Sequence, residues 1–224
     1  MIGNQITECG VIARKARIAS GRLSNASTSE KNIALVHLAE LLESEMAAIL
    51  AANEIDFEEG KKTLSAAMAD RLMLNENRIR CMAADVRSVA NLPDPIGEVF
   101  EESIHANGMR IEKRRVPIGV VAVIYESRPN VTIDAACLMI KSGNAVILRG
   151  GKETIRTNLV LASLVRRSLH EAGLPEDSVQ LIESPDRGLV LDLLNQAETV
   201  DLVIPRGGSG LHKFCREHSR IPVI

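Results

Sequence analysis

The sequence predicts an α/β protein in which N-terminal helices and a β-hairpin precede an open parallel sheet with helices on both faces. Apolar residues recur at helical spacing through residues 1–95. An Asn-Gly pair between two polar segments predicts a hairpin within residues 96–117. Short apolar runs then alternate with helical stripes over residues 118–224, which is typical of parallel strands connected by helices. We take these three ranges as the predicted domains.

The composition excludes several functional classes. The 224 residues carry a formal net charge of −2, so no basic surface indicates nucleic-acid binding. Aromatic residues make up 2% of the chain, too few for base-stacking platforms. No apolar run could span a bilayer or serve as a signal peptide, which favours a cytoplasmic protein without a membrane partner. The histidines and cysteines show neither metal-ligand nor disulfide spacing, so we expect no metal site.

Four helices are predicted in the first domain. The second begins at a capping box, in which Ser27 is the cap and Glu30 reaches back to it, and it continues to Gly60. Residues 66–74 and 76–90 form two further helices. The apolar face of the first helix consists of Ile6, Ala13, Ala16 and Leu23, and that of the second of Ile33, Val36, Leu38, Leu42, Met46 and Ile49.

The hairpin is predicted from two segments on either side of Asn107-Gly108, residues 97–104 and 109–116. Both segments are rich in polar and charged residues. We therefore expect a ribbon that is exposed or packs on another chain.

In the third domain, residues 120–125 form a continuous apolar run, as expected for a strand that is buried on both faces. The helix after it ends at Gly143, and a later helix ends at Gly173-Leu174-Pro175, a strong stop signal. The apolar stripe of the first of these helices consists of Ile133, Ala136, Cys137 and Ile140. The remaining strands are predicted at residues 145–148, 179–182, 200–204 and 221–224, and the helices between them at residues 154–172, 187–195 and 211–217.

Ligands of open α/β sheets bind beyond the carboxyl ends of the strands, so the loops there are candidate sites. Asn130 follows the first strand and lies beside a helix N-terminus predicted near Thr132. Its amide could cap that helix, or it could join backbone N–H groups in holding an anion. The residues alone favour the capping interpretation.

Two other loops carry cations and glycines. Arg149-Gly150-Gly151-Lys152 follows the second strand, where glycines would let the backbone approach a phosphate and cations would neutralise it. A solvated turn is the equal alternative. Arg206-Gly207-Gly208-Ser209 enters a helix but is a weak anion site by itself, because it has neither the spacing of a dinucleotide-binding fingerprint nor that of a P-loop.

The four cysteines, Cys9, Cys81, Cys137 and Cys215, all fall within predicted helices. Cys81 and Cys137 lie on apolar stripes. We therefore expect buried structural thiols rather than nucleophiles.

The three candidate loops lie in three long segments, residues 115–130, 142–153 and 204–213, which contain Asn130, Lys152 and Gly208 respectively. Together and in this order they resemble the gamma-glutamyl phosphate reductase family of the aldehyde dehydrogenase superfamily. The Arg-Gly-Gly-Lys-Glu and Pro-Arg-Gly-Gly motifs distinguish this family from ordinary aldehyde dehydrogenases. The resemblance spans essentially the whole chain and implies a Rossmann-like sheet of the aldehyde dehydrogenase type.

The resemblance implies an NADPH-dependent oxidoreductase of proline biosynthesis, which reduces L-glutamyl 5-phosphate to L-glutamate 5-semialdehyde and phosphate through a cysteine thioester. It implies that Asn130 helps to stabilise the oxyanion. The cofactor NADP(H) would meet Arg149 and Lys152 near its ribose and 2′-phosphate. Its pyrophosphate would face Gly207, Gly208 and Ser209, and the cofactor-binding set is completed by Gly150, Gly151 and Arg206.

The family's cysteine-bearing segment lies beyond the fifth strand, whereas this sequence ends at Ile224. We therefore expect a chain that stops before the nucleophile and is inactive alone. The resemblance also implies a homo-oligomeric full-length enzyme and makes glutamate 5-kinase a candidate partner. One alternative is a non-catalytic module that binds a nucleotide or a partner chain. Another is a hydrolytic aldehyde dehydrogenase, which Lys152 disfavours because many NAD-using relatives have a ribose-binding carboxylate there.

Overall fold

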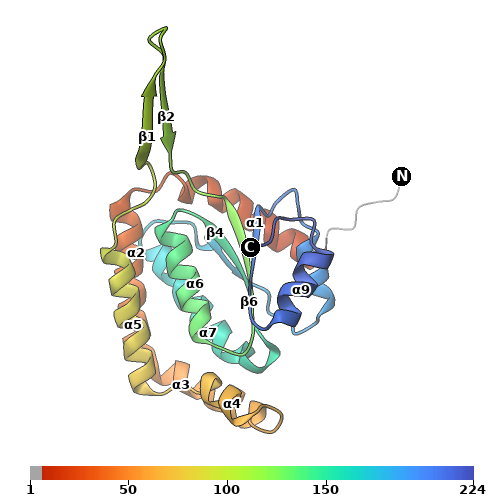
Figure 1. The fold of residues 1–224 in the computed structure, drawn as a ribbon. Helices are drawn as coiled ribbons and strands as arrows, with labels where there is room; N and C mark the ends of the chain where they lie inside the picture. Colours follow the sequence, from red (N-terminus) through yellow and green to blue (C-terminus); the bar gives the residue numbers. More distant parts are fainter. Residues whose placement is uncertain (1–6) are drawn as a thin grey trace.

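A four-stranded parallel sheet forms the centre of the computed structural model, which describes residues 7–224 (Figure 1). The strands lie in the order β5-β4-β3-β6, and every neighbouring pair is parallel. Their bounds are β3 (Val120–Tyr125), β4 (Ala145–Arg149), β5 (Val179–Leu181) and β6 (Leu202–Arg206). The predicted open parallel sheet is confirmed, and the carboxyl ends of its strands meet at one edge.

Helices cover both faces of the sheet because alternate side chains of a strand point to opposite sides. Val121 and Val123 pack into one hydrophobic cluster, whereas Ala122 and Ile124 pack into a second cluster on the other face. All six residues of β3 are buried, which explains its continuous apolar run. The first face carries α6 (Asn130–Lys141) and α7 (Ile155–Glu171), and the second carries α1 (Glu8–Leu23), α8 (Gly188–Leu194) and α9 (Ser209–His218).

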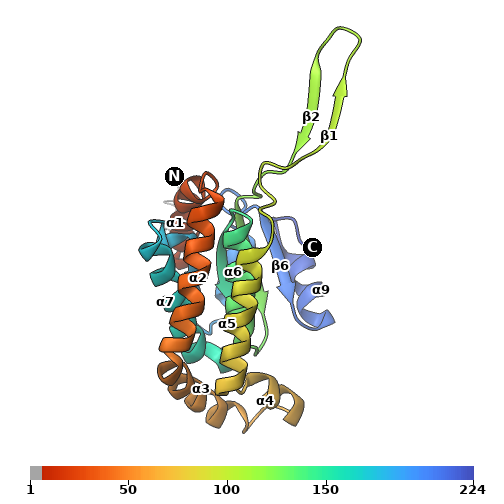
Figure 2. The ribbon, with the colours of Figure 1, turned by 90° about the vertical axis from the view of Figure 1, so that its left-hand side faces the viewer.

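A further layer of helices lies outside α6 and α7 (Figure 2). Here α2 (Thr28–Ser44) packs against α5 (Glu76–Asn91) and α7, and α3 (Met46–Gly60) packs against α7 and the short α4 (Ala66–Leu72). The capping box at the start of α2 is confirmed, since Ser27 Oγ accepts from the Glu30 N–H at 3.2 Å and Glu30 Oε2 accepts from the Ser27 N–H at 2.7 Å.

The prediction of one helix from the capping box to Gly60 is wrong. The backbone leaves helical geometry at Glu45, with φ −95° and ψ 15°, and the chain changes direction there. This break lets α2 lie along α5 and α7 while α3 crosses the base of the molecule towards the start of α7 (Figure 2). Ile6, assigned to the first helix from the sequence, lies outside the described residues.

The hairpin is present as predicted. Its strands β1 (Val99–Ile104) and β2 (Arg110–Arg114) pair antiparallel, and nearly all of their residues are exposed. Gly108 has φ +85°, a conformation that favours glycine, which explains the Asn-Gly turn. The hairpin projects away from the body of the molecule (Figure 1).

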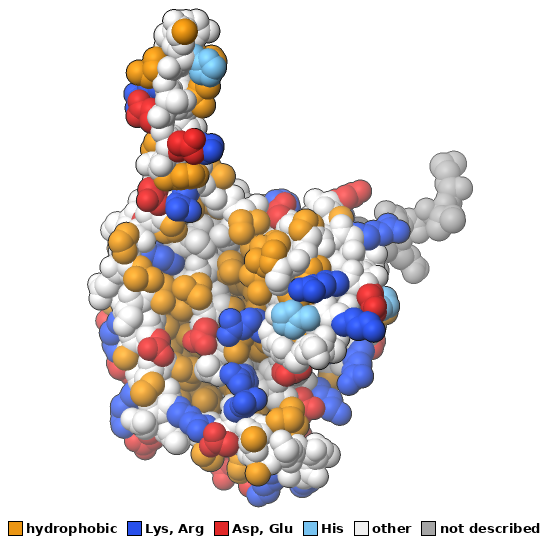
Figure 3. Space-filling view, viewed as in Figure 1, with side chains coloured by type: hydrophobic (Ala, Val, Ile, Leu, Met, Phe, Trp, Pro, Cys, Tyr) orange, Lys and Arg blue, Asp and Glu red, His pale blue; other side chains and the backbone are white. Residues whose placement is uncertain are grey.

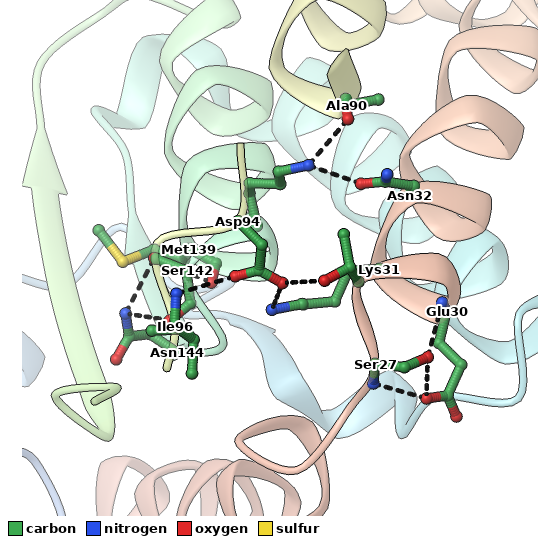
Figure 4. Close-up of polar contacts among 12 residues, drawn as sticks. Ser27, Glu30, Lys31, Asn32, Ala90, Asp94, Ile96, Met139, Ser142 and Asn144 are labelled. Carbon is green, nitrogen blue, oxygen red and sulfur yellow. Dashed lines mark hydrogen bonds and ion pairs between the residues drawn. The ribbon is translucent and has the colours of Figure 1, made fainter. Parts of the chain in front are cut away.

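A buried polar cluster fixes the chain between α5 and the hairpin (Figure 4). Asp94 accepts from Lys31 Nζ at 2.5 Å and from the Ile96 N–H at 3.0 Å. The Lys141 Nζ, from α6, donates to Asn32 Oδ1 at 2.6 Å and to the Ala90 carbonyl at 2.8 Å. Both lysine side chains are buried, so these partners replace the water that the ammonium groups lose on folding.

The chain returns to the sheet after α9. A fifth strand was predicted at residues 221–224, but the structure has a single parallel bridge there, between Val203 and Val223. Ile221 is buried in the cluster of α1, α8 and α9, so this segment still covers part of the β6 edge.

Candidate cofactor and active site

Three of the predicted cofactor-binding residues meet at a cavity of about 490 Å³ beyond the carboxyl ends of β3 and β4. Its polar lining includes Arg149, Gly151 and Lys152 from the loop after β4 and Arg187 from the loop after β5. Its apolar lining includes Pro185, Val190, Leu211 and Phe214. A volume of this size and a mixed lining of this kind are typical of cofactor sites.

Arg149 is buried and is held by the backbone. Its two terminal nitrogens donate to the carbonyls of Gly150 at 2.7 Å and Pro185 at 3.0 Å, and its Nε has no partner among the described residues. Burial lowers the pKa of the guanidinium, and the nearby Arg187 lowers it further. Arg149 therefore joins the loops after β4 and β5, which brings a second arginine, Arg187, to the same cavity.

The two glycines after Arg149 are required by packing. A Cβ at Gly150 would lie 2.2 Å from Asn158 Nδ2 and 3.0 Å from the Tyr125 ring. A Cβ at Gly151 would lie 3.0 Å from Ser127 Oγ. Glu153 Oε2 accepts from that same hydroxyl at 2.8 Å, so the loops after β3 and β4 are joined directly. Lys152 remains exposed at the rim, with no ion pair among residues 7–224.

The glycine-rich turn after β6 lines a second cavity, of about 380 Å³, together with Arg71, Glu126, Arg128 and Arg206. Gly208 is the N-cap of α9, and its N–H donates to Glu126 Oε1 at 3.1 Å. A carboxylate thus occupies the first free N–H of this helix, where an anion is favoured. Ser209, the first residue of α9, is exposed.

Asn130 lies at the start of α6, after β3, and does not cap that helix. It is the first residue of α6, and the N-cap residue is Pro129. The Asn130 amide donates to Asp134 Oδ2 at 3.0 Å, one turn further along α6. The capping interpretation is therefore wrong, since no backbone N–H uses this side chain.

A third cavity, also about 380 Å³, is lined by Asn130 and Asp134 together with Arg71, Arg128 and Cys81. Burial raises the pKa of Asp134, and the Asp85 carboxylate raises it further, whereas the Asn130 hydrogen bond and Arg206 act in the opposite direction. Arg71 and Arg128 line both this cavity and the one beside Gly208.

The cysteines only partly follow the prediction. Cys9, Cys137 and Cys215 are buried, and burial raises the pKa of Cys9 and of Cys137 to about 12. Burial also raises the pKa of Cys215. Cys81, predicted to be buried, is exposed, because α5 turns this side chain away from its packed face and into the cavity of Asn130.

Sequence reasoning missed Arg71, Arg187 and the apolar residues Leu211 and Phe214. Arg187 stands after the third strand of the sheet, so the rule that selected the other loops could have found it. Arg71 had no such signal, since it comes from α4, far from the sheet in sequence.

Within residues 7–224, no helix is long and apolar enough to cross a membrane, and no group of three or more histidine, cysteine or acidic residues is arranged to hold a metal ion.

The fold defines a protein of the open parallel α/β class, with cavities beyond the carboxyl ends of its strands. Residues 5–213 match the model of the aldehyde dehydrogenase family, so the chain belongs to that family. Within it, a gamma-glutamyl phosphate reductase of Vibrio cholerae is 53% identical over 96% of this chain and 52% of its own length. The chain spans about half the length of the curated relatives that it matches.

Solved structures agree with the sequence relatives. The crystal structure of gamma-glutamyl phosphate reductase from Thermotoga maritima superposes with a TM-score of 0.94 at 43% identity, covering 97% of this chain and 53% of its own. The enzyme of that name from Saccharomyces cerevisiae gives a TM-score of 0.91 at 34% identity, covering 98% of this chain and 56% of its own. The resemblance expected from the sequence is thereby confirmed.

Proposed function

We propose that this chain supplies the cofactor-binding region and the oxyanion group of an NADPH-dependent gamma-glutamyl phosphate reductase of the cytoplasm. The reaction is the reduction of L-glutamyl 5-phosphate to L-glutamate 5-semialdehyde and phosphate, an early step of proline biosynthesis. The observation that carries the proposal is the cavity beyond β3 and β4, whose mixture of cationic and apolar lining residues suits a dinucleotide. The names of the relatives from Vibrio cholerae and Thermotoga maritima support the same reaction.

The described residues suit two groups of NADP(H), the adenine ring and the 2′-phosphate of the adenosine. Val190, Leu211 and Phe214 offer apolar surface for an adenine ring between α8 and α9. Lys152 and Arg187 line the same cavity and would favour a 2′-phosphate over a free hydroxyl. Glu153 lies in the same cavity, but one of its oxygens accepts from Ser127, which directs that oxygen towards the protein.

When bound, the nicotinamide supplies the hydride, and the role of this chain is to bind, orient and stabilise charge. The second N–H of the Asn130 amide is free of Asp134 and would donate to the oxygen that becomes negatively charged when a thiolate adds to the acyl carbon. The thioester step needs a low-pKa thiolate. Cys9, Cys137 and Cys215 are buried with raised pKa values, and we assign the nucleophile to none of the four cysteines.

We propose that the hairpin contacts a second copy of the chain in the complete enzyme. Three large apolar side chains of the hairpin are exposed, Phe100 and Ile104 on β1 and Ile111 on β2. A cluster of exposed apolar side chains is typical of a surface that binds another chain.

The test is an assay of NADPH-dependent reduction of L-glutamyl 5-phosphate by two proteins. One is residues 1–224 alone. The other is a chimera in which residues 1–224 replace the matching half of the Vibrio cholerae relative, to which they are 53% identical. We expect turnover by the chimera and none by residues 1–224 alone. Asn130→Ala in the chimera should reduce turnover by roughly 10²–10³-fold without unfolding it.

Two results would contradict the proposal. One is a folded chimera that binds NADPH but does not turn over. The other is turnover by residues 1–224 alone that is lost on Cys81→Ser, since Cys81 would then be the nucleophile.

A further inference from the structure

Two cavities of about 380 Å³ each share Arg71 and Arg128 as lining residues. One cavity continues to Asn130, and the other continues to Arg206 and the glycines at the start of α9. Arg71 comes from α4 and Arg128 from the loop after β3, so two distant parts of the chain bring cations to one place. Figure 3 shows Lys and Arg side chains gathered on this face, between the positions of α6 and α9.

Arg71, Arg128 and Arg206 have no carboxylate partner. Among residues 7–224, none of the three forms an ion pair or a side-chain hydrogen bond, although the chain pairs many of its other arginines. Arg78 in the same region is a useful contrast, because it pairs with Asp70 at 2.9 Å and also donates to the Met73 carbonyl.

Four carboxylates line the same two cavities, Asp70, Asp85 and Asp134 in one and Glu126 in the other. Glu126 accepts from the Gly208 N–H, and Asp134 accepts from the Asn130 amide. Asp70 pairs with Arg78, and Asp85 lines the cavity without forming an ion pair within the described residues. In the cavity of the glycine-rich turn, three guanidinium groups therefore face one carboxylate, Glu126, and none of them forms an ion pair with it within the described residues. This excess of positive charge would favour an anion bound there.

We propose that Arg71, Arg128 and Arg206 form a binding site for a phosphoryl dianion, and that this dianion is the phosphoryl group of an acyl phosphate substrate. The proposal rests on the proposed function and deepens it. A guanidinium group donates two parallel hydrogen bonds to phosphate oxygens, so three of them suit a dianion better than a single carboxylate. The site adjoins Asn130, so an acyl phosphate could place its phosphoryl group on the arginines while its carbonyl oxygen faces the amide.

A phosphoryl group could also come from the cofactor, whose pyrophosphate is expected at Gly207 and Gly208. Arg71 and Arg128 favour the substrate because they also line the cavity of Asn130, where no residue of the glycine-rich turn is found.

The experiment measures the binding of inorganic phosphate to the purified protein by calorimetry at pH 7.5, without and with saturating NADPH. The variants are Arg71→Gln, Arg128→Gln and Arg206→Gln. Arg216→Gln is the matched control, because Arg216 is also exposed on α9 but lines neither cavity. Thermal melting of each variant checks that it is folded.

We expect Arg71→Gln and Arg128→Gln each to weaken phosphate binding at least tenfold, with Arg216→Gln unchanged and with phosphate still bound when NADPH is saturating. A phosphate affinity unchanged by Arg71→Gln and Arg128→Gln would overturn the proposal. Complete displacement of phosphate by NADPH would assign the arginines to the cofactor and would also overturn it. Failure to bind NADPH while phosphate still binds would instead contradict the proposed function alone, so the two failures can be told apart.

Discussion

The side-chain amide of Asn130 donates a 3.0 Å hydrogen bond to Asp134, one turn further along α6. Asp134 is partly buried, and its pKa lies above the usual value because burial and the Asp85 carboxylate both disfavour its charged form. The relationship fixes one N–H of Asn130 and leaves the other available to a ligand. It also gives Asp134 a predictable effect on stability.

Asp134→Asn is expected to be at least as stable as the parent protein at pH 7. The folded-state pKa of Asp134 is raised, so folding favours its protonated form. Its contribution to stability is therefore complete below about pH 3.8, the value for the unfolded chain, and is lost as pH rises through the folded-state pKa. Urea unfolding of both proteins between pH 3 and pH 8 checks this. A variant that is less stable than the parent by the same amount at every pH would contradict it.

Asp85→Asn is a second variant for the same measurement. Removing this neighbouring carboxylate should lower the pKa of Asp134 towards its usual value. The free energy of unfolding of Asp85→Asn should therefore change less with pH than that of the parent protein. Asp85 on α5 and Arg206 on β6 act on the Asp134 carboxyl from other elements, and Asn130 bonds to it from its own helix. Arg71, Arg78, Cys81 and Arg128 line the same cavity.

Cys81 is expected to be the single cysteine that reacts rapidly with a thiol reagent in the folded protein. Cys9 and Cys137 are buried with pKa values of about 12, so almost no thiolate is present at pH 8. Mass spectrometry after brief labelling at pH 8 should show one adduct, and Cys81→Ser should show none. Rapid labelling of two or more cysteines would contradict the close packing of α1, α6 or α9, which carry Cys9, Cys137 and Cys215.

Asp94→Asn is expected to destabilise the protein by about 3 kcal/mol, because it leaves the buried ammonium of Lys31 without its charged partner (Figure 4). Glu43→Gln, at the exposed pair with Arg87, is the control and should cost less than about 1 kcal/mol. The double variant Lys31→Met with Asp94→Leu should recover much of the loss, since it removes both charges. Equal losses for Asp94→Asn and Glu43→Gln in urea unfolding would be inconsistent with this account.

The same pair predicts a dependence on pH. Burial tends to raise the pKa of Asp94, but hydrogen bonds from Lys31, Ile96 and Thr28 outweigh it and hold the pKa below its usual value. The stability that Asp94 contributes is therefore present above about pH 3.8 and is lost as pH falls through the lower folded-state value. Asp94→Asn should lack this loss at acid pH.

Much of the fold could be predicted because local signals agreed with the final packing. The buried run at 120–125 and the capping box of Ser27 and Glu30 depend on neighbours in sequence, and both are present. The break at Glu45 was not predicted, and the contact that α3 makes beyond it is with α7, which lies over a hundred residues away from Glu45. Cys81 was misplaced for a similar reason, since the sequence does not say which side of α5 remains unpacked.

The candidate site was predicted only where it lies in loops after strands. That rule found Asn130, Lys152 and the turn at Gly208, and it could have found Arg187. It could not find Arg71, which reaches the site from α4 through tertiary packing. It also could not show that Arg149 donates to the carbonyls of Gly150 and Pro185, because such bonds require the loop geometry itself.

We propose that the cavity beyond β3 and β4 binds NADP(H) through its cationic lining residues Lys152 and Arg187. The most direct measurement is titration of the purified protein with NADPH and with NADH, for the parent, for Lys152→Glu and for Lys62→Glu. Lys62 is an exposed lysine outside the cavity and serves as the control. We predict NADPH binding at least tenfold tighter than NADH binding, with Lys152→Glu weakening NADPH about tenfold or more and leaving NADH and the control unchanged. Equal affinities for the two cofactors, or an NADPH affinity unaffected by Lys152→Glu, would contradict the account.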